Sequence, residues 1–406
     1  MRIHNYFVFI ILFSVINFSV IAGEFSGNIS AELKAFKNEA QLDEQEQFYG
    51  SLAFQPEFFH DFSDGDQRIT FTGFGRYSPA NESRNHVDIR ELFWSYFSDD
   101  WELRAGIRKV FWGVTESQHL VDIINQTDTL EGFDGEEKLG QPMLHLSWFQ
   151  DWGTTEFFVL PGFRKREFSS EDARLRPPFL IESSDALYES DAEEKHVDLA
   201  IRWTHVLGDW DVGFSHFYGT NREPRLILDP SLINMPQTFI GTQPIKLVPY
   251  YDIINQTGLD VQATLDNWLW KAEAIYRSGM SEDFYATTIG LEYSFFDIQS
   301  TGVDIGLVLE HLYDDRGTES TNPFENDIMT GFRLALNDEQ STEALFGVIQ
   351  DINGDASILS VEASRRLGEQ FKLIIEGLLF TETNENDFMH NFRSDDYIQI
   401  ELAYYF

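Results

Sequence analysis

Polar and apolar residues alternate along most of this chain in segments of about ten residues. In the segment 102–108, apolar residues at the odd positions alternate with Glu102, Arg104 and Arg108. The segment 257–265 repeats the pattern. Successive side chains of a strand point to opposite faces, so each segment has one apolar and one polar face. The chain is therefore predicted to be rich in half-apolar β-strands.

The alternation predicts an all-β transmembrane, antiparallel up-and-down β-barrel of about 18 strands, or 16 if two weak strands merge. Turns of two or three residues, such as 98–100 and 266–267, follow the even strands, and longer connections follow the odd ones. This order is typical of short periplasmic turns and long extracellular loops, with both termini periplasmic. The strands are expected to begin near Gly27, Phe48, Ile69, Val87, Trp101, Met143, Thr154, His196, Trp210, Thr257, Trp268, Tyr285, Gly302, Ile328, Glu343, Ile358, Gln370 and Tyr397.

The first 22 residues are predicted to be a cleaved signal peptide. Arg2 precedes an apolar run from Tyr6 to Ile21, and the segment ends in Val20-Ile-Ala22. A membrane anchor is the alternative, but a run of about 16 residues is short for one. Residues 23–406 then form the barrel, and the expected location is the cell outer membrane.

Composition narrows the function. The chain has 68 Asp and Glu against 29 Lys and Arg, a net charge of −39, and 15% aromatic residues. This acidity argues against nucleic acid as a partner, and the aromatic content argues against a disordered acidic chain. The absence of cysteine excludes disulfides, thiol nucleophiles and thiolate metal sites. We expect no metal and no other cofactor.

The last ten residues, 397–406, alternate as a strand and end on an aromatic residue. This ending resembles the closing strand and assembly signal of Gram-negative outer-membrane barrels. The resemblance implies that Tyr404 and Phe406 are read by the barrel-assembly machinery, and that outer-membrane lipid and lipopolysaccharide surround the protein. A homo-oligomer is compatible with it.

The third external loop, 111–141, contains too many apolar residues for a solvated loop. The segments 104–113 and 122–128 resemble a pattern in porin-like outer-membrane barrels, including uncharacterised relatives of the alginate-export type. The resemblance implies that the connection folds inward and narrows a pore. The alternative is a loop that caps the barrel from outside.

Candidate pore residues follow from this arrangement. If the connection enters the barrel, its acids would face arginines of the wall, and opposed charges across a narrow gap set an ion preference. Alternatively, these arginines form salt bridges that only stiffen the wall. The acids are Asp122, Asp128, Glu131 and Asp134, and the arginines are Arg76, Arg104 and Arg108.

Arg90 breaks the alternation, because it shares a face with Leu92 and Trp94 while Glu91 lies opposite. Mixed charges elsewhere favour a hydrated, charge-paired interior over the apolar cavity of a lipid carrier. The further pore-lining candidates are Trp112, Asn125, Arg202, Asp260, Lys271 and Glu273.

The predicted function is passive diffusion of small hydrophilic or charged solutes through an outer-membrane channel. Two alternatives are an export or uptake component for a polymer or lipid with periplasmic partners, and a non-conducting adhesion or structural barrel. We expect the protein to have no enzymatic activity. The histidines are scattered without a matching nucleophile, and carboxylates are too abundant to mark a catalytic pair.

Overall fold

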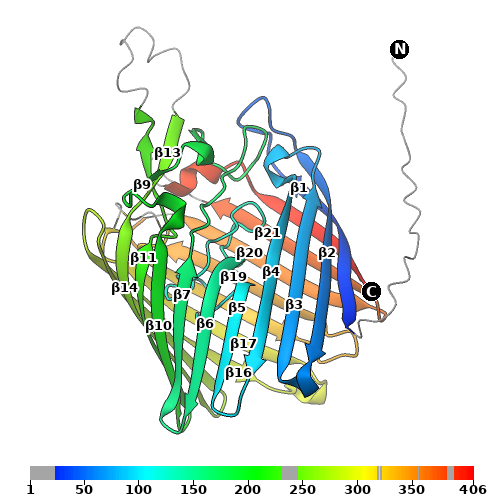
Figure 1. Cartoon of the computed structure of the whole chain (residues 1–406). Helices are drawn as coiled ribbons and strands as arrows, with labels where there is room; N and C mark the ends of the chain where they lie inside the picture. Colours follow the sequence, from blue (N-terminus) through cyan, green and yellow to red (C-terminus); the bar gives the residue numbers. More distant parts are fainter. Residues whose placement is uncertain (1–22, 231–245, 318–319, 321, 355, 382–387) are drawn as a thin grey trace, which may run out of the picture.

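Eighteen strands form one closed antiparallel barrel in the computed structural model, which describes residues 23–230, 246–317, 320, 322–354, 356–381 and 388–406 (Figure 1). The predicted signal peptide lies outside the described residues. The barrel strands are β1 (Glu24–Phe36), β2 (Phe48–Phe62), β3 (Gln67–Tyr77), β4 (His86–Phe97), β5 (Trp101–Arg108), β6 (Gln141–Gln150), β7 (Gly153–Pro161), β10 (Val197–Leu207), β11 (Trp210–Thr220), β14 (Ile253–Leu265), β15 (Trp268–Ser278), β16 (Phe284–Phe295), β17 (Asp304–Asp314), β18 (Asn326–Ala335), β19 (Glu343–Asp351), β20 (Ser357–Leu367), β21 (Phe371–Thr381) and β22 (Tyr397–Tyr405).

The last strand closes the barrel on the first. Residues 397–405 of β22 pair with 28–36 of β1, and the backbone of Phe406 exchanges hydrogen bonds with Gly27. The predicted all-β barrel of 18 strands is confirmed, and the alternative count of 16 is wrong. Closure leaves the barrel without an open edge between its first and last strands, which a strand protein needs in lipid.

The two faces of each strand differ as the alternation predicts. On β15, Trp270 and Tyr276 are exposed on the outer wall, whereas Glu273 and Arg277 are buried inside. Most exposed aromatic and aliphatic side chains of the strands belong to the outer set. An apolar outer wall around a polar interior is the arrangement of a membrane barrel.

A β-bulge in β4 resolves the conflict at Arg90. Thr72 of β3 pairs with Glu91 and the next residue, Gly73, pairs with Ile89, so Arg90 is the extra residue. Both Arg90 and Glu91 then lie on the inner side, while Ile89 and Leu92 stay exposed outside. The extra residue restores the alternation above it.

The interior is not charge-paired throughout. Phe158, Leu160, Phe217 and Ile254 on β7, β11 and β14 are almost fully buried inside the barrel. The expectation of a hydrated, charge-paired interior is therefore wrong for this side. Water is displaced there by a segment of the chain, described below.

A second, four-stranded sheet lies beyond one end of the barrel (Figure 1). Its strands are β8 (Leu180–Ile181), β9 (Leu187–Tyr188), β12 (Arg225–Leu228) and β13 (Lys246–Tyr251), with β12 antiparallel and β8 and β9 parallel to β13. The helical turns are η1 (Ser63–Gly65), η2 (Glu82–Arg84), η3 (Ser183–Asp185), η4 (Glu193–Lys195), η5 (Ile298–Ser300) and η7 (Phe388–Phe392). In the described part of the chain, none of the helices is long and apolar enough to cross a membrane.

Candidate pore and its inserted segment

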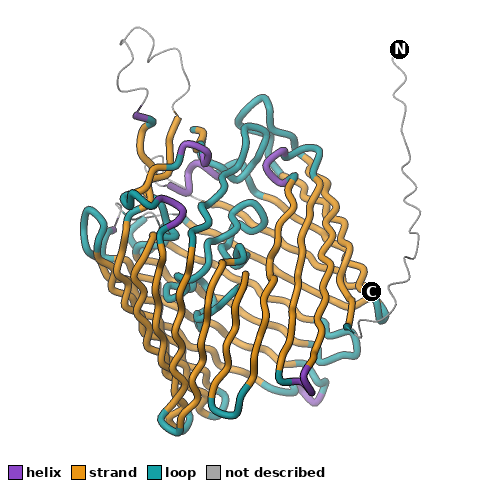
Figure 2. Tube along the Cα trace, in the orientation of Figure 1, coloured by secondary structure: helices purple, strands orange, loops and turns teal. Residues whose placement is uncertain are grey.

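Segment 111–141 lies within the barrel, where Figure 2 shows it as loop between the strands. Val121, Ile123 and Ile124 are almost fully buried and belong to the same apolar cluster as Phe158 and Phe217 of the wall. Burying such side chains stabilises a structure by roughly 1.5–3 kcal/mol each. The apolar residues of this segment thus dock it against the β7 to β14 side.

Two carboxylates of the wall hold the segment through its backbone. Glu273 accepts hydrogen bonds from the backbone N–H groups of Val114 (2.6 Å), Thr115 (3.0 Å) and Val121 (3.1 Å). Glu310 on β17 accepts from the N–H groups of Glu116 and Ser117, both at 2.8 Å. Hydrogen bonds to an ionised group are the strong ones, so these carboxylates fix the segment on the β15 and β17 side.

Asp122 and Asn125 satisfy the segment's own backbone. Asp122 accepts from the N–H groups of Trp112 (2.6 Å) and Gly113 (3.1 Å). Asn125 accepts from the N–H of Val110 (2.9 Å) and donates to the carbonyls of Arg108 and Leu139, both at 2.8 Å. Both residues were candidates for lining the pore. They do line the cavity described below, and their side chains also shape the turn into the barrel.

Some wall arginines do face acids of the segment. Arg90 lies 2.5 Å from Asp128, and Arg76 lies 2.7 Å from Glu131. Arg84, which the sequence analysis missed, also contacts Glu131 at 3.4 Å. Arg76 and Arg84 share a second carboxylate, Glu32 of β1, at 3.0 and 2.6 Å.

The other arginines have partners within the wall, so the expectation that Arg104 and Arg108 face the acids of the segment is wrong. Arg104 forms an ion pair with Glu102, and Arg108 lies 2.6 Å from a ring nitrogen of His145. Glu102 lies two residues from Arg104 on the same face of β5, and His145 lies on the neighbouring β6.

Arg202 lies 2.8 Å from Asp260, and its guanidinium carbon is 5.2 Å from the ring centroid of Trp112. Lys271 lies 3.6 Å from Glu116 of the segment. These side chains thus contact the segment or each other, and Arg202, Asp260 and Lys271 are not among the residues that line the cavity described below.

His119 joins the segment to the wall and was not among the predicted site residues. Its imidazole lies 2.9 Å from Glu136 and 3.8 Å from Glu273. Burial opposes the charge, but the two carboxylates outweigh it and raise the pKa of His119 to about 10. The imidazole of His119 is therefore protonated near neutral pH and lies between the two carboxylates.

A cavity of about 1040 Å³ remains between the segment and the opposite wall. Asn28 and Tyr405, paired near one end of the barrel, line it, and so does Ile181 of β8 beyond the other end. The cavity thus extends along the barrel beside β1 and β18 to β22. A cavity of this length is a candidate route through the barrel.

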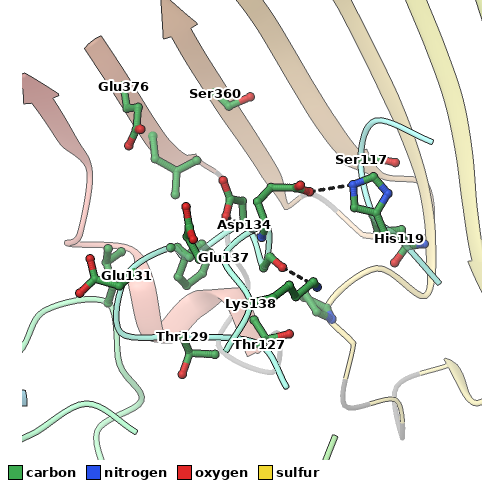
Figure 3. A pocket seen from close by; sticks show the side chains of 18 of the residues that line it. Ser117, His119, Thr127, Thr129, Glu131, Asp134, Glu137, Lys138, Ser360 and Glu376 are labelled. Atoms are coloured by element: carbon green, nitrogen blue, oxygen red, sulfur yellow. Dashed lines mark hydrogen bonds and ion pairs between the residues drawn. The ribbon is translucent and has the colours of Figure 1, made fainter. Parts of the chain in front are cut away.

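Four acids form what we term the acidic cluster of this cavity: Asp134, Glu137, Glu362 and Glu376. Figure 3 shows Asp134 and Glu137 on the segment and Glu376 on the wall around the same space. Among the described residues, none of the four lies within 4.0 Å of a basic group. Burial inside the barrel and the nearby Glu136 carboxylate raise the pKa of Asp134, although its side chain is open to the cavity.

No model of a known protein family matches the chain, and no curated protein matches it in sequence. Solved structures match along most of its length. OccK11 of Pseudomonas aeruginosa is 9% identical with a TM-score of 0.52, over 94% of this chain and 95% of that one.

Wzi of Escherichia coli, an outer-membrane protein involved in group 1 capsule assembly and a carbohydrate-binding barrel, is 8% identical with a TM-score of 0.51, over 92% and 83%. A mutant of the porin of Rh. blastica is 11% identical with a TM-score of 0.46, over 95% and 100%. At these identities the likeness establishes the fold, which is that of a porin-like outer-membrane β-barrel. The resemblance to the alginate-export type stays a prediction.

Proposed function

We propose that this protein is a passive channel of the outer membrane for small hydrophilic solutes, with a preference for cations. The observation that carries the proposal is the cavity, which extends from Asn28 and Tyr405 to Ile181 and holds the acidic cluster. The outer wall suits lipid, and the proposal places residues 1–22 as the export signal. The proposed transport involves no chemical reaction.

The charge inventory supports the cation preference. Most lumen arginines are neutralised by a carboxylate within 4.0 Å, as Arg76, Arg84 and Arg90 are. Within the acidic cluster the carboxylates lack such a partner, so their field acts on the solution in the cavity. Rings of Asp and Glu side chains favour cations in channels. The acids Asp122 and Asp128, which the sequence suggested for selectivity, are engaged with the segment's backbone and with Arg90.

The test is single-channel conductance and reversal potential in a planar bilayer under a potassium chloride gradient. The wild type is expected to give a steady current with a reversal potential on the cation side. Asp134→Asn/Glu137→Gln is expected to move the reversal potential toward zero while keeping the current. Absence of any ion current through the wild-type protein in all salts would contradict the proposal.

Asp266→Asn is the matched control. Asp266 lies in the exposed turn between β14 and β15 and has φ +54, a conformation that Asn tolerates. It removes an acid without touching the cavity, so its reversal potential should equal that of the wild type. If Asp266→Asn shifts the reversal potential as much as the double variant does, ion selectivity depends on the net charge of the protein and not on the acidic cluster.

A second candidate is polymer or lipid export or uptake with periplasmic partners. The inserted segment favours it, because Glu273 and Glu310 fix the segment across the interior. In that case the purified barrel would stay silent in the bilayer and bind an oligosaccharide or lipid, which a calorimetric titration detects.

A further inference from the structure

The barrel wall is incomplete above β5. Strand β4 pairs with β3 up to His86, but with β5 only over Leu92–Phe97. Strand β5 ends at Arg108, and the chain then turns into the barrel. Among the described residues, the backbone of 86–89 makes no hydrogen bond except those to β3. We call this place, between the upper part of β4 and the ends of β6 and β7, the notch.

The notch lies at the depth of the apolar outer wall. Val87 on β4 is 90% exposed, and Ile89 beside it is exposed as well. On the other side of the notch, Val159 and Val197 of β7 and β10 are exposed and apolar. An unpaired strand edge in lipid is costly, so a membrane barrel normally closes such an edge with a neighbouring strand.

An ion pair and a glycine contact close the notch instead. Arg164, three residues after β7, lies 2.8 Å from Asp88 of β4 and donates to the carbonyl of Gly140 at 2.9 Å. Gly140 lies so close to β4 that a Cβ there would be 2.2 Å from the carbonyl oxygen of Arg90. The bulge at Arg90 sits at the same point. This closure lacks the hydrogen-bond ladder that joins the other strands.

Basic groups lie behind the notch. Arg90 and Lys109 line the cavity, and among the described residues no carboxylate lies within 4.0 Å of the Lys109 ammonium. Arg164 lies at the opening itself, paired with Asp88. Phe111, next to the end of β5, is half exposed and does not line the cavity. The place thus combines an apolar outside with a basic inside.

We propose that the notch is a lateral gate between the membrane and the cavity, and that it admits an amphiphile with an acidic head group and a long acyl chain. The acyl chain stays against Val87, Ile89 and Phe111, while the head group passes to Lys109. Opening requires the separation of Asp88 from Arg164. Such a route differs from the axial one proposed above, because its ligand comes from the lipid phase.

The test uses a long-chain fatty acid with a photoreactive diazirine on the chain carbons beside its carboxylate, dissolved in liposomes that hold the protein. Labelled residues are located by mass spectrometry. Since the chain has no cysteine, Asp88→Cys/Arg164→Cys can be joined selectively by a bismaleimide. Labelling behind the notch, at Phe74, Arg90 and Lys109, is expected in the wild type and should be lost in the joined protein. Asp88→Asn should increase it about fivefold, because one partly exposed ion pair is removed.

Asp61→Cys/Arg68→Cys is the matched control. Asp61 and Arg68 also form a cross-strand ion pair, at 2.6 Å, but on β2 and β3 where the ladder is complete. Joining them should leave labelling unchanged. Labelling of the cavity that persists in the joined 88/164 protein would show entry from the barrel ends and overturn the gate.

Absence of labels behind the notch even in Asp88→Asn would overturn the gate too. The methyl ester of the same probe tests the head group, since equal labelling by acid and ester would overturn the role of Lys109. These outcomes do not depend on ion current, so they are separate from the test of the channel.

Discussion

At the scale of single residues, alternation in the sequence predicts which face of the barrel wall a side chain lies on, but not which residue it contacts. Glu273 is buried on the inner face of β15, where the alternation of that strand places it, and Asn125 is buried on the inserted segment. Their contacts could not be predicted, since Glu273 meets the backbone of residues more than 150 positions earlier in the chain. His119 carried no signal, because a lone histidine in a loop has no pattern that points to Glu136 and Glu273.

Replacing Glu273 by glutamine is expected to release the inserted segment. The amide keeps one acceptor oxygen but directs an N–H₂ group at backbone donors, and the ionic character of the hydrogen bonds is lost. A loss of about 2 kcal/mol raises the detached population roughly thirtyfold. Single-channel recordings of Glu273→Gln should show larger current fluctuations, and limited proteolysis should cut within 111–141.

The matched control for this change is Glu102→Gln. Glu102 is equally buried inside the wall, but it pairs with Arg104 and makes no contact with the segment. Its recordings should match those of the wild type. If both variants fluctuate alike, the carboxylate of Glu273 is not a specific anchor.

At the scale of elements, the strands follow from the sequence and their exceptions do not. The residues 157–160 of β7 are apolar on both faces, which is a sign of an inner wall covered by protein that the sequence analysis did not use. The strands β8, β9, β12 and β13 are only two to six residues long and lie in the long connections, so no alternation develops in them. In the sequence, the bulge of β4 is visible only as a break in the alternation at Arg90. The pairing with β3 is needed to identify Arg90 as the extra residue.

Two single deletions, one residue apart, should separate the bulge from the facing of β4. Deleting Arg90 removes the extra residue and leaves Asp88 inside and Ile89 outside, so the barrel should still assemble. Deleting Ile89 forces Arg90 or Asp88 to the outer face, and a charge such as Arg in lipid costs about 2–4 kcal/mol near the midplane. The folded fraction in outer membranes, measured by heat-modifiable gel migration, should fall for the second deletion only. Equal loss in both would contradict the assigned bulge.

At the scale of the whole molecule, insertion of segment 111–141 into the barrel creates contacts that no local pattern contains. Glu32 of the first strand meets Arg84 and, through the shared Arg76, Glu131 of the inserted segment. The sequence predicts a closed acidic barrel, because alternation and net charge are sums over the chain. It does not predict which half of the interior is apolar and which half contains the cavity. This division depends on the side of the wall against which segment 111–141 packs.

The division of the interior sets the last prediction, which concerns the pH dependence of ion selectivity in the whole channel. The pKa of Asp134 lies above that of an ordinary aspartate, because burial and the Glu136 carboxylate disfavour its charge. Burial acts on Glu136 in the same direction, but the hydrogen bond to His119 and the charges of His119 and Lys138 together outweigh it and hold the pKa of Glu136 below the usual range. As pH falls, Asp134 therefore takes up its proton at a higher pH than a free aspartate does, and cation preference should begin to decline there. Reversal potentials in a potassium chloride gradient, recorded stepwise from pH 8 to pH 4, measure this decline. Asp134→Asn should remove the early part of the decline, whereas Glu136→Gln should lower the selectivity at all these pH values. A profile that stays unchanged in Asp134→Asn would show that the solute route avoids the acidic cluster.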